Sequence, residues 1–402
     1  MVVLLSEGSS LTSRETLTVL GMRGIGADVL TAQPVTLSRF SRWTRRTIRS
    51  PRASSDPLGY LALVGELMSS GEYEAVLATH EQAWLFAAGR ALLAAGAPIA
   101  VAGIEAFDRV QGKVEFAALL EELDVPQPPW WHVEQPPLQT PYPHWVKASH
   151  GTAGRSVRRV ANPAEEAAAI REMSSPGDVL MGQAPAPGQY GQVQGLFENG
   201  RLIAVHTSVQ RAVGAGGSAA ARLSVDHPEA RTYAARIGEH LGWHGSLTFD
   251  YLHQDGHPLF IECNPRMVEP GNAAYAGVDF PALTIGLATG RQLPAEPLVA
   301  RPGVLTRSAM ALALGAAENT GSRRAIMRAV TSCALSRGEL GAAAEVLTPV
   351  RRDPPSVLPV GIIAAKLLIR PHNVGALARG AVEDYALSPA AIEAVKASAR
   401  AT

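Results

Sequence analysis

The sequence predicts an α/β and α+β multidomain protein with a parallel N-terminal sheet, antiparallel sheets after it, and a helical C-terminal region. The first hundred residues alternate strand and helix patterns, which is typical of a parallel sheet covered by helices. Strand patterns dominate residues 145–260, with turn signals at Glu198-Asn-Gly and Asp255-Gly that favour antiparallel hairpins. From about residue 281 the chain is rich in alanine and reads as helical.

In the N-terminal part we expect four strands, at residues 2–6, 27–31, 74–79 and 98–102, with a helix after the first. The glycines Gly21, Gly24 and Gly26 do not have the spacing of a dinucleotide fingerprint, and the phosphate loop that ends in Gly-Lys-Ser/Thr is absent. This part is therefore expected to be a scaffold or a substrate-side domain.

An arginine-rich stretch lies between the second and third expected strands. Its arginines follow a near-helical spacing, which indicates a solvated face or, alternatively, a contact for an acidic substrate or partner. These arginines are Arg39, Arg42, Arg45, Arg49 and Arg52.

Residues 108–130 predict an amphipathic helix stopped by prolines, and a proline-rich linker follows it. The helical C-terminal region either packs for stability, caps a site or builds a homodimer.

Composition excludes several classes of protein. The 402 residues are 47% hydrophobic and 18% charged, which describes a globular chain and not a disordered one. The formal net charge of zero gives no reason to expect a nucleic-acid or membrane partner. The N-terminus does not resemble a signal peptide, and the apolar run at 358–369 is too short for a bilayer and contains Lys366. Two cysteines are too few for a disulfide framework, so a reducing cytoplasm is expected.

Lysine is rare in this chain. Of 36 basic residues only four are lysines, namely Lys113, Lys147, Lys366 and Lys396. Positions that keep lysine either need a compact, flexible point charge or retain it by chance.

The segment LFIECNPRM (residues 259–267) places polar side chains at alternate positions of an apolar run. In a strand, Glu262, Asn264 and Arg266 share one face, as in any half-exposed strand. The turn at Asp255-Gly would also bring Asp250 beside them. Two carboxylates and an amide oxygen suit Mg²⁺, which prefers oxygen ligands and phosphates. The histidines His244, His253 and His257 match that ion poorly and are expected to be surface or core residues.

Two weaker features accompany this segment. Lys147 lies on a strand before a loop with Gly151, Gly154 and Ser156, which could cradle phosphates or be an ordinary hairpin turn. The strand around Met181, Gly182 and Gln183 could present free backbone groups to an adenine ring or be a core strand.

Together, the two lysines, the glycine loop, the apolar strand and the Asp…Glu-x-Asn-Pro-Arg segment resemble the ATP-grasp superfamily and its carboxylate–amine (amino-acid or peptide) ligases. The resemblance covers roughly residues 1–290. It implies an N-terminal pre-ATP-grasp domain at 1–103 and an ATP-grasp domain at 104–292, with a small lobe at about 135–185 and a large lobe at about 186–292. A helical region at 293–402 lies outside the resemblance.

The resemblance also implies roles for individual residues. ATP would be bound by Lys113, Lys147, Gly151, Gly154, Ser156, Met181, Gly182 and Gln183. Mg²⁺, with Mn²⁺ as an alternative, would be bound by Asp250, Glu262 and Asn264. Arg266 would contact the transferred phosphate or the acyl group, helped by Arg211 and Arg222, which flank a glycine-rich segment that could act as a lid. Two positions depart from the family pattern: Tyr190 follows Gly188 where an acid usually binds the ribose, and Ser156 replaces a glycine.

The implied activity is ATP-dependent amide-bond formation through an acylphosphate, with small-molecule carboxylate and amine substrates. The alternatives are an enzyme with a thiol or hydroxyl acceptor and a non-catalytic nucleotide-binding regulatory module. The sequence does not identify either substrate.

Overall fold

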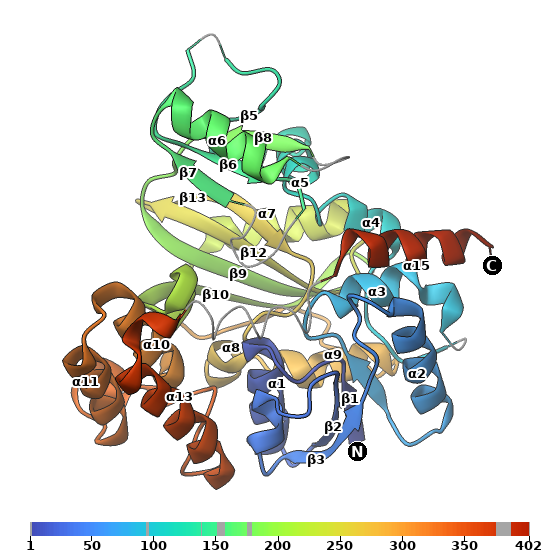
Figure 1. Ribbon diagram of the computed structural model, residues 1–402. Coiled ribbons are helices and arrows are strands. Elements are labelled where there is room, and N and C mark those ends of the chain that lie inside the picture. The colour runs from blue at the N-terminus through green and yellow to red at the C-terminus, as the bar shows by residue number, and fades with distance from the viewer. Residues whose placement is uncertain are drawn as a thin grey trace.

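The computed structural model describes residues 2–93, 96–137, 139–150, 157–174, 179–374 and 387–401. Figure 1 shows the N-terminal domain (blue) below, a small lobe above, a large sheet between them, and most of the C-terminal helices (orange and red) at one side. The chain thus combines a parallel sheet, two further sheets and a mainly helical C-terminal region, which confirms the predicted fold class.

A parallel four-stranded sheet forms the N-terminal domain. Its strands, in spatial order, are β3 (Thr44–Arg49), β2 (Gly26–Thr31), β1 (Val2–Leu5) and β4 (Ala75–Leu77). One face packs on α1 (Leu11–Met22) and on α9 (Phe280–Ala288), which comes from much later in the chain. The other face packs on α2 (Pro57–Ser69) and α3 (Gln82–Ala88). Since α9 is shared, the N-terminal domain is fixed to the large lobe by apolar packing.

One expectation for this domain is wrong. Residues 98–102 do not form a strand, because the segment begins with a proline and gives the sheet only a bond from Val76 N–H to the Pro98 carbonyl. The arginine-rich stretch contains the edge strand β3, which was not predicted, and its Arg39, Arg42, Arg45 and Arg49 are exposed, in line with a solvated face. Arg46 pairs with Asp28 at 2.7 Å and with Glu72 at 2.7 Å, so part of this charge is partnered within the domain.

The small lobe is an antiparallel sheet of β5 (Trp130–His132), β8 (Leu180–Gln183), β6 (His144–Ala148) and β7 (Val157–Val160). Helix α6 (Pro163–Met173) packs on one face, and α5 (Lys113–Glu122) contacts the other through Val114, Ala117 and Met181. Because α4 (Ile104–Asp108) and α5 follow the N-terminal domain directly, they connect it to this lobe.

The large sheet has the strand order β13-β12-β9-β10-β11-β15-β16, with β14 beside β10. The predicted turn at Asn199-Gly200 connects β9 to β10, and both residues have positive φ (49° and 88°), as a tight hairpin requires. Helix α7 covers the face opposite the small lobe and packs on Phe197, Phe249 and Phe260. These elements are β9 (Gln189–Glu198), β10 (Arg201–Val213), β11 (Ala219–Ser224), α7 (Pro228–His240), β12 (Gly245–Gln254) and β13 (His257–Asn264).

The large sheet extends beyond the expected boundary at residue 292, because the edge of β11 pairs with β15 (Leu305–Arg307) and β15 pairs with β16 (Ala344–Glu345). The remaining elements of this part are α8 (Gly271–Tyr275), β14 (Leu298–Val299), α10 (Ala309–Thr320), α11 (Arg323–Ala334), α12 (Gly338–Ala342) and α13 (Val357–Ile369). A fully buried pair, Arg14 with Asp353 at 2.5 Å, joins this region to α1.

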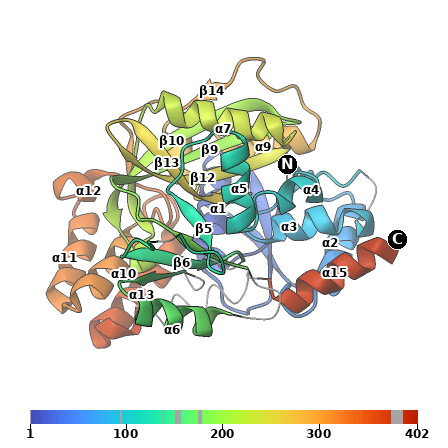
Figure 2. The same ribbon diagram turned by 90° about the horizontal axis from the view of Figure 1, so that it is seen from above.

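The last helix, α15 (Pro389–Ala401), lies apart from the other C-terminal helices and packs on α2 and α3 of the N-terminal domain. Figure 2, viewed from above, shows it on the opposite side of the molecule from α11 and α13. In the described part of the chain, no helix has the length and apolarity needed to span a bilayer.

Candidate active site

A hairpin supplies the centre of the site. In the β12–β13 ladder Asp250 lies opposite Glu262, and Thr248 lies opposite Asn264. A register irregularity at Asp250/Tyr251 resets the alternation, so that Phe260 and Cys263 point into the core under α7 while Glu262 and Asn264 face the small lobe. The hairpin expected from the sequence is therefore present, and it brings the three predicted metal ligands together.

Asp250 is held by several donors. Gln192 Nε2 donates to its Oδ1 at 3.0 Å, Asn264 Nδ2 lies 3.3 Å from its Oδ2, and the Tyr190 hydroxyl also donates to it. Burial, and secondarily the opposing Glu262 carboxylate, raise the pKa of Asp250 to about 6. Two carboxylates forced together in this way repel each other, and a divalent cation would relieve that repulsion.

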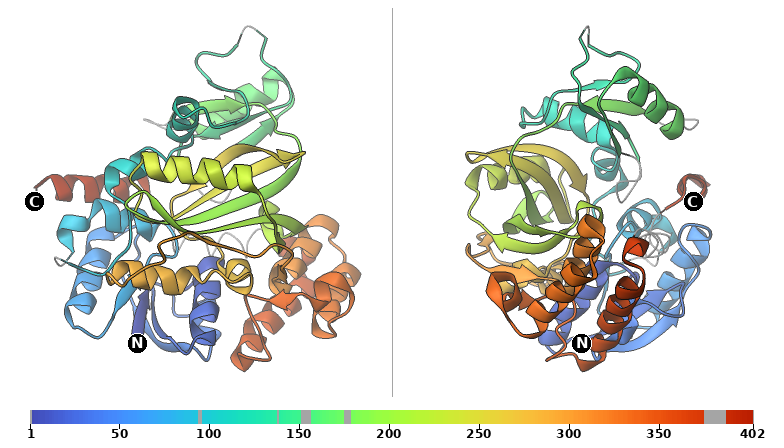
Figure 3. Two further views of the ribbon diagram at one scale, coloured as in Figure 1. Left: turned by 180° about the vertical axis from the view of Figure 1, so that it is seen from behind. Right: turned by 60° about the vertical axis from the view of Figure 1, so that its left-hand side comes forward.

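Two lysines approach the same carboxylate from different elements. Lys113 begins α5, and its Nζ lies 4.0 Å from Glu262 Oε1. Lys147 on β6 is buried and donates to Gln183 Oε1 at 2.6 Å. Burial lowers the pKa of Lys147 to about 8; the charge of Glu262 opposes this shift and that of Lys113 adds to it. Both lysines are thus close enough to Glu262 to interact with its charge. The right panel of Figure 3 shows the ribbon of the two lobes in side view.

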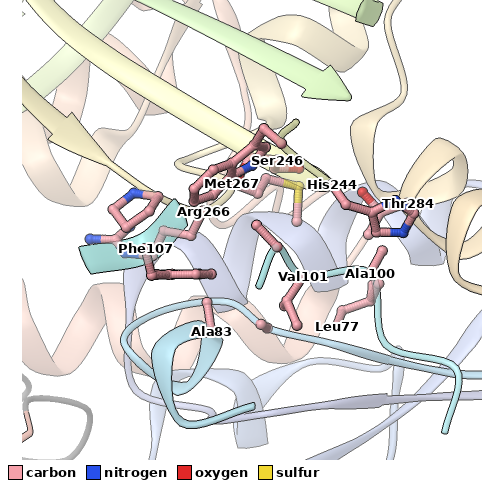
Figure 4. Close-up of a pocket in the computed structure, with 14 residues that line it drawn as sticks. Leu77, Ala83, Ala100, Val101, Phe107, His244, Ser246, Arg266, Met267 and Thr284 are labelled. Atoms are coloured by element: carbon pink, nitrogen blue, oxygen red, sulfur yellow. The ribbon is translucent and has the colours of Figure 1, made fainter. Parts of the chain in front are cut away.

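Arg266 lies at the end of the hairpin, where its Nη2 donates to Asn264 Oδ1 at 3.0 Å. It borders His80 of the N-terminal domain: burial, and then the charge of Arg266, hold the pKa of His80 well below its usual value. A cavity of about 20 Å³ adjoins Arg266. Figure 4 shows Arg266, Met267 and Phe107 on one side of this cavity and His244 and Thr284 at its other end.

The two helper arginines differ. Arg222 is 8% exposed and pairs with Glu269 at 3.0 Å, and it is near enough to Asp250 to influence its titration. Burial lowers the pKa of Arg222, but the charges of Glu269 and Tyr190 outweigh this effect and hold the pKa above its usual value. Arg211, in contrast, lies at an irregularity of the β10–β11 ladder and pairs with Glu339 of α12, so the structure does not bring it to the site.

The segment between these arginines is not an isolated lid. It forms the end of the β10–β11 hairpin, where Gly216 N–H donates to Glu318 of α10 at 2.7 Å.

The expected adenine strand also differs from its prediction. Met181, Gly182 and Gln183 belong to a central strand paired with β5 on one side and β6 on the other, so their backbone groups serve the sheet. Met181 is 1% exposed and packs on α5, and Gln183 contributes through its side chain to Lys147. Backbone pairing ends after Ala184, whose N–H donates to the Pro129 carbonyl, because prolines follow at 185 and 187. Gly151, Gly154 and Ser156 lie outside the described residues.

Sequence reasoning missed the partners on β9. Gln192 and Gln194 oppose Asp250 and Thr248 in the ladder, on the same face as the metal ligands. The alternation of Gln192 and Gln194 with Gly191 and Val193 was a usable signal. No such signal in the sequence pointed to Glu15 of α1, which lies near Arg222. Burial, and secondarily the charge of Glu269, raise the pKa of Glu15 to about 8.

The donor set fits a magnesium ion that obtains its other ligands from phosphates. Within the described residues no group of three or more His, Cys, Asp or Glu side chains could hold a metal by itself. The site offers the two facing carboxylates and the Asn264 amide. The oxygen of this amide accepts a hydrogen bond from Arg266, and its nitrogen donates to Asp250. The amide would therefore have to rotate to turn its oxygen toward Asp250. Few protein ligands plus substrate phosphates are usual for Mg²⁺.

A larger pocket of about 220 Å³ opens beside this hairpin. Its lining combines Glu262, Asn264 and Arg266 with residues of the N-terminal domain and of α15. The molecule therefore has room next to the candidate metal ligands for a small second substrate.

Comparisons with known proteins agree with this architecture. No family model matches the chain. The acetyl-CoA carboxylase of Schizosaccharomyces pombe is 31% identical over 173 residues, which are 39% of this chain and 8% of that protein. The chain thus spans less than a tenth of the length of the curated relatives it matches.

Two solved structures illustrate the shared fold. The L-amino acid ligase of Bacillus licheniformis superposes with a TM-score of 0.54 at 16% identity, over 71% of this chain and 73% of that chain. The ADP complex of N5-carboxyaminoimidazole synthetase from Staphylococcus aureus superposes with a TM-score of 0.58 at 13% identity, over 77% and 83%. The chain has a parallel N-terminal sheet, an antiparallel small-lobe sheet, and a mainly antiparallel large sheet that contains the Asp250–Glu262 hairpin. Together with these likenesses, this arrangement establishes that the chain has the ATP-grasp fold.

Proposed function

We propose that the protein is an ATP-dependent carboxylate–amine ligase that forms an amide or peptide bond and releases ADP and phosphate. The observation that carries this proposal is the convergence of Lys113 and Lys147 on Glu262, directly opposite Asp250. Binding of a nucleotide base alone needs neither this carboxylate pair nor two buried or half-buried lysines beside it.

In the proposed reaction, a carboxylate oxygen of the first substrate forms a bond to the γ-phosphorus of ATP while the bond to the β-phosphate oxygen breaks and ADP leaves. The nitrogen lone pair of the amine then attacks the acyl carbon, the bond to phosphate breaks, and the amine proton passes to solvent. Mg²⁺ bound by Asp250, Glu262 and Asn264 would supply charge neutralisation for the phosphates.

The protein's own contribution is positioning and electrostatics. Lys113 and Lys147 provide positive charge beside Glu262, and Arg266 provides it in the lining of the larger pocket. Gln192 and Tyr190 keep Asp250 oriented from β9. Burial of these groups limits water, which would hydrolyse an acylphosphate.

A carboxylation reaction is the second candidate, because the likenesses include acetyl-CoA carboxylase and N5-carboxyaminoimidazole synthetase as well as an L-amino acid ligase. In that case bicarbonate would replace the organic acid. The larger pocket favours the organic acid, since 220 Å³ with aromatic walls exceeds what bicarbonate needs.

The test is ADP release from the purified full-length chain with Mg²⁺, ATP and pooled carboxylic acids, with and without pooled amino acids and other amines. We expect ADP release that requires both an acid and an amine and that yields an amide by mass spectrometry. ADP release that requires bicarbonate alone would replace this proposal with the carboxylation reaction. ATP binding without stimulated turnover would favour a regulatory nucleotide-binding module.

A further inference from the structure

The larger pocket is lined in part by the C-terminal helix α15, which the ligase chemistry does not require. The pocket is also lined by Glu262, Asn264 and Arg266, at the end of the hairpin. The apolar walls of the pocket are formed by Trp84 and Phe116. Helix α15 contributes Ile392 and Lys396, and Leu387 contributes from just before this helix. A volume of about 220 Å³ lies below the ~300 Å³ at which drug-sized pockets begin, so the pocket suits a small metabolite.

Helix α15 is firmly attached to the N-terminal domain. Leu387 N–H donates to Glu81 Oε2 at 2.6 Å, and Ser388 Oγ donates to the Ser54 carbonyl at 2.6 Å. Val395 is fully buried in the core around α2 and α3, and Ala391 is 3% exposed. Figure 1 shows α15 (red) lying over the N-terminal domain beside α3 and α4.

This attachment fixes what the helix presents to the pocket. Ile392 and Lys396 are four residues apart, so they project from the same face one turn from each other. Ile392 extends the apolar walls, whereas Lys396 places a cation on the side contributed by α15.

Within the described residues, the charge of Lys396 is not neutralised by a partner. The side chain is half-buried, and it has no ion-pair or hydrogen-bond partner in the described parts of the chain. Two acids also line the pocket, but Glu81 accepts the Leu387 N–H and Asp108 is exposed to solvent. The buried imidazole of His80 is neutral, because burial and the charge of Arg266 lower its pKa. The pocket therefore has apolar walls with cations from three separate elements: Arg266 from the hairpin, Lys113 from the start of α5 beside Glu262, and Lys396 from α15.

We propose that this pocket is the subsite for the carboxylate substrate, and that the substrate is a small carboxylic acid with an aromatic or branched apolar body and a second anionic group. The reacting carboxylate lies toward Arg266, the apolar body lies against Trp84, Phe116 and Ile392, and the second anion pairs with Lys396. This assignment rests on the proposed function, because only an acyl-activating enzyme needs a carboxylate beside the candidate metal ligands.

The experiment compares pairs of acids that differ by one carboxylate. Phenylsuccinate and hydrocinnamate are such a pair, and branched aliphatic pairs extend the panel. Isothermal titration calorimetry on the full-length chain, saturated with Mg²⁺ and a non-hydrolysable ATP analogue, gives their dissociation constants. We expect at least one dianion to bind about 10-fold or more tightly than its monoanion.

The variants identify the group responsible. Lys396→Ala removes the preference for the dianion, Lys396→Arg retains it, and Lys366→Ala, at an exposed lysine of α13, is the matched control with unchanged binding. Three results would each overturn the assignment. Both members of every pair bind with equal affinity, no dianion of the panel binds, or the preference for the dianion survives Lys396→Ala. Unchanged analogue affinity in Lys396→Ala shows that the variant is folded.

These outcomes separate the subsite from the reaction. Lys396-dependent dianion binding with no ADP release retains the subsite and refutes the ligase. Acid-dependent ADP release without any effect of Lys396 retains the ligase and refutes the subsite.

Discussion

The hairpin end and the α15 end of the site are built in different ways. At the hairpin end, Asp250, Glu262 and Asn264 come from two adjacent strands joined by a two-residue turn, and their charges are engaged with Lys113, Gln192 and Arg266. At the α15 end, the lining comes from segments up to some three hundred residues apart, its walls are apolar, and Lys396 is unpaired within the described chain.

This difference indicates a division of work. A local, densely paired constellation suits phosphate chemistry that does not vary between substrates, whereas an apolar pocket assembled from distant segments can vary to suit one substrate. Changes at the hairpin end should therefore affect every substrate, and changes at the α15 end should affect only the acid.

The largest effect is expected from Glu262→Gln. This change keeps the shape of the side chain but removes one of two facing carboxylates, and turnover should fall by about 1,000-fold, equivalent to about 4 kcal/mol. Steady-state ADP release measures it for all acids and amines. Glu66→Gln, at an exposed position of α2, is the control and should retain full activity. Near-normal turnover in Glu262→Gln would contradict the metal assignment.

Lys147→Ala comes next. Loss of a charged donor to phosphate should weaken ATP binding by about 10- to 100-fold, since such bonds contribute about 1.5–3 kcal/mol. Calorimetric titration with MgATP measures the change, and a thermal melt verifies folding because Gln183 loses its partner. Lys366→Ala should bind ATP normally, and an equal loss in both variants would show that the effect is not specific to the site.

The pH dependence of ATP binding depends on the same lysine. Because the pKa of Lys147 is lowered to about 8, its charge is present below pH 8 and lost above it. The dissociation constant for MgATP should be flat from pH 7 to 8 and rise by roughly 10-fold per pH unit beyond. Lys147→Arg, which stays charged, should flatten this rise. A wild-type dissociation constant that does not change up to pH 9.5 would mean that Lys147 does not contact the nucleotide.

The smallest effect is expected from Ile392→Ala. Shortening one apolar wall should raise KM for the acid by about 3- to 10-fold, in line with about 1 kcal/mol per lost apolar contact group, and leave KM for ATP unchanged. Ile369→Ala, at a side chain that is 69% exposed, is the matched control. If both KM values rise together in Ile392→Ala, the wall does not act on the acid alone.

The hairpin could be predicted from sequence because its information is local. Alternation within LFIECNPRM and one Asp-Gly turn predict the hairpin and the shared face of Glu262 and Asn264. The bulge that places Glu262, and not Ile261, opposite Asp250 was not predicted. The parallel N-terminal sheet was predictable for a similar reason, from short apolar runs between helices.

The errors arose where tertiary contacts override local pattern. The edge strand β3, where Arg45 and Arg46 pair with Asp28 and Glu72, was not predicted, because no spacing reveals these partners. Arg211 is directed to Glu339 by an irregularity in its ladder. The position of α15 against α2 and α3 depends on contacts across almost the whole chain, and so does the pocket it lines.

The most direct measurement is the anomalous scattering of Mn²⁺ in crystals of the full-length chain grown with a non-hydrolysable ATP analogue. We predict a peak between Asp250 and Glu262, about 2.0–2.2 Å from a carboxylate oxygen of each, with phosphate oxygens completing the coordination. A manganese peak elsewhere, or a bound nucleotide whose phosphates lie away from this hairpin, would contradict the proposed site.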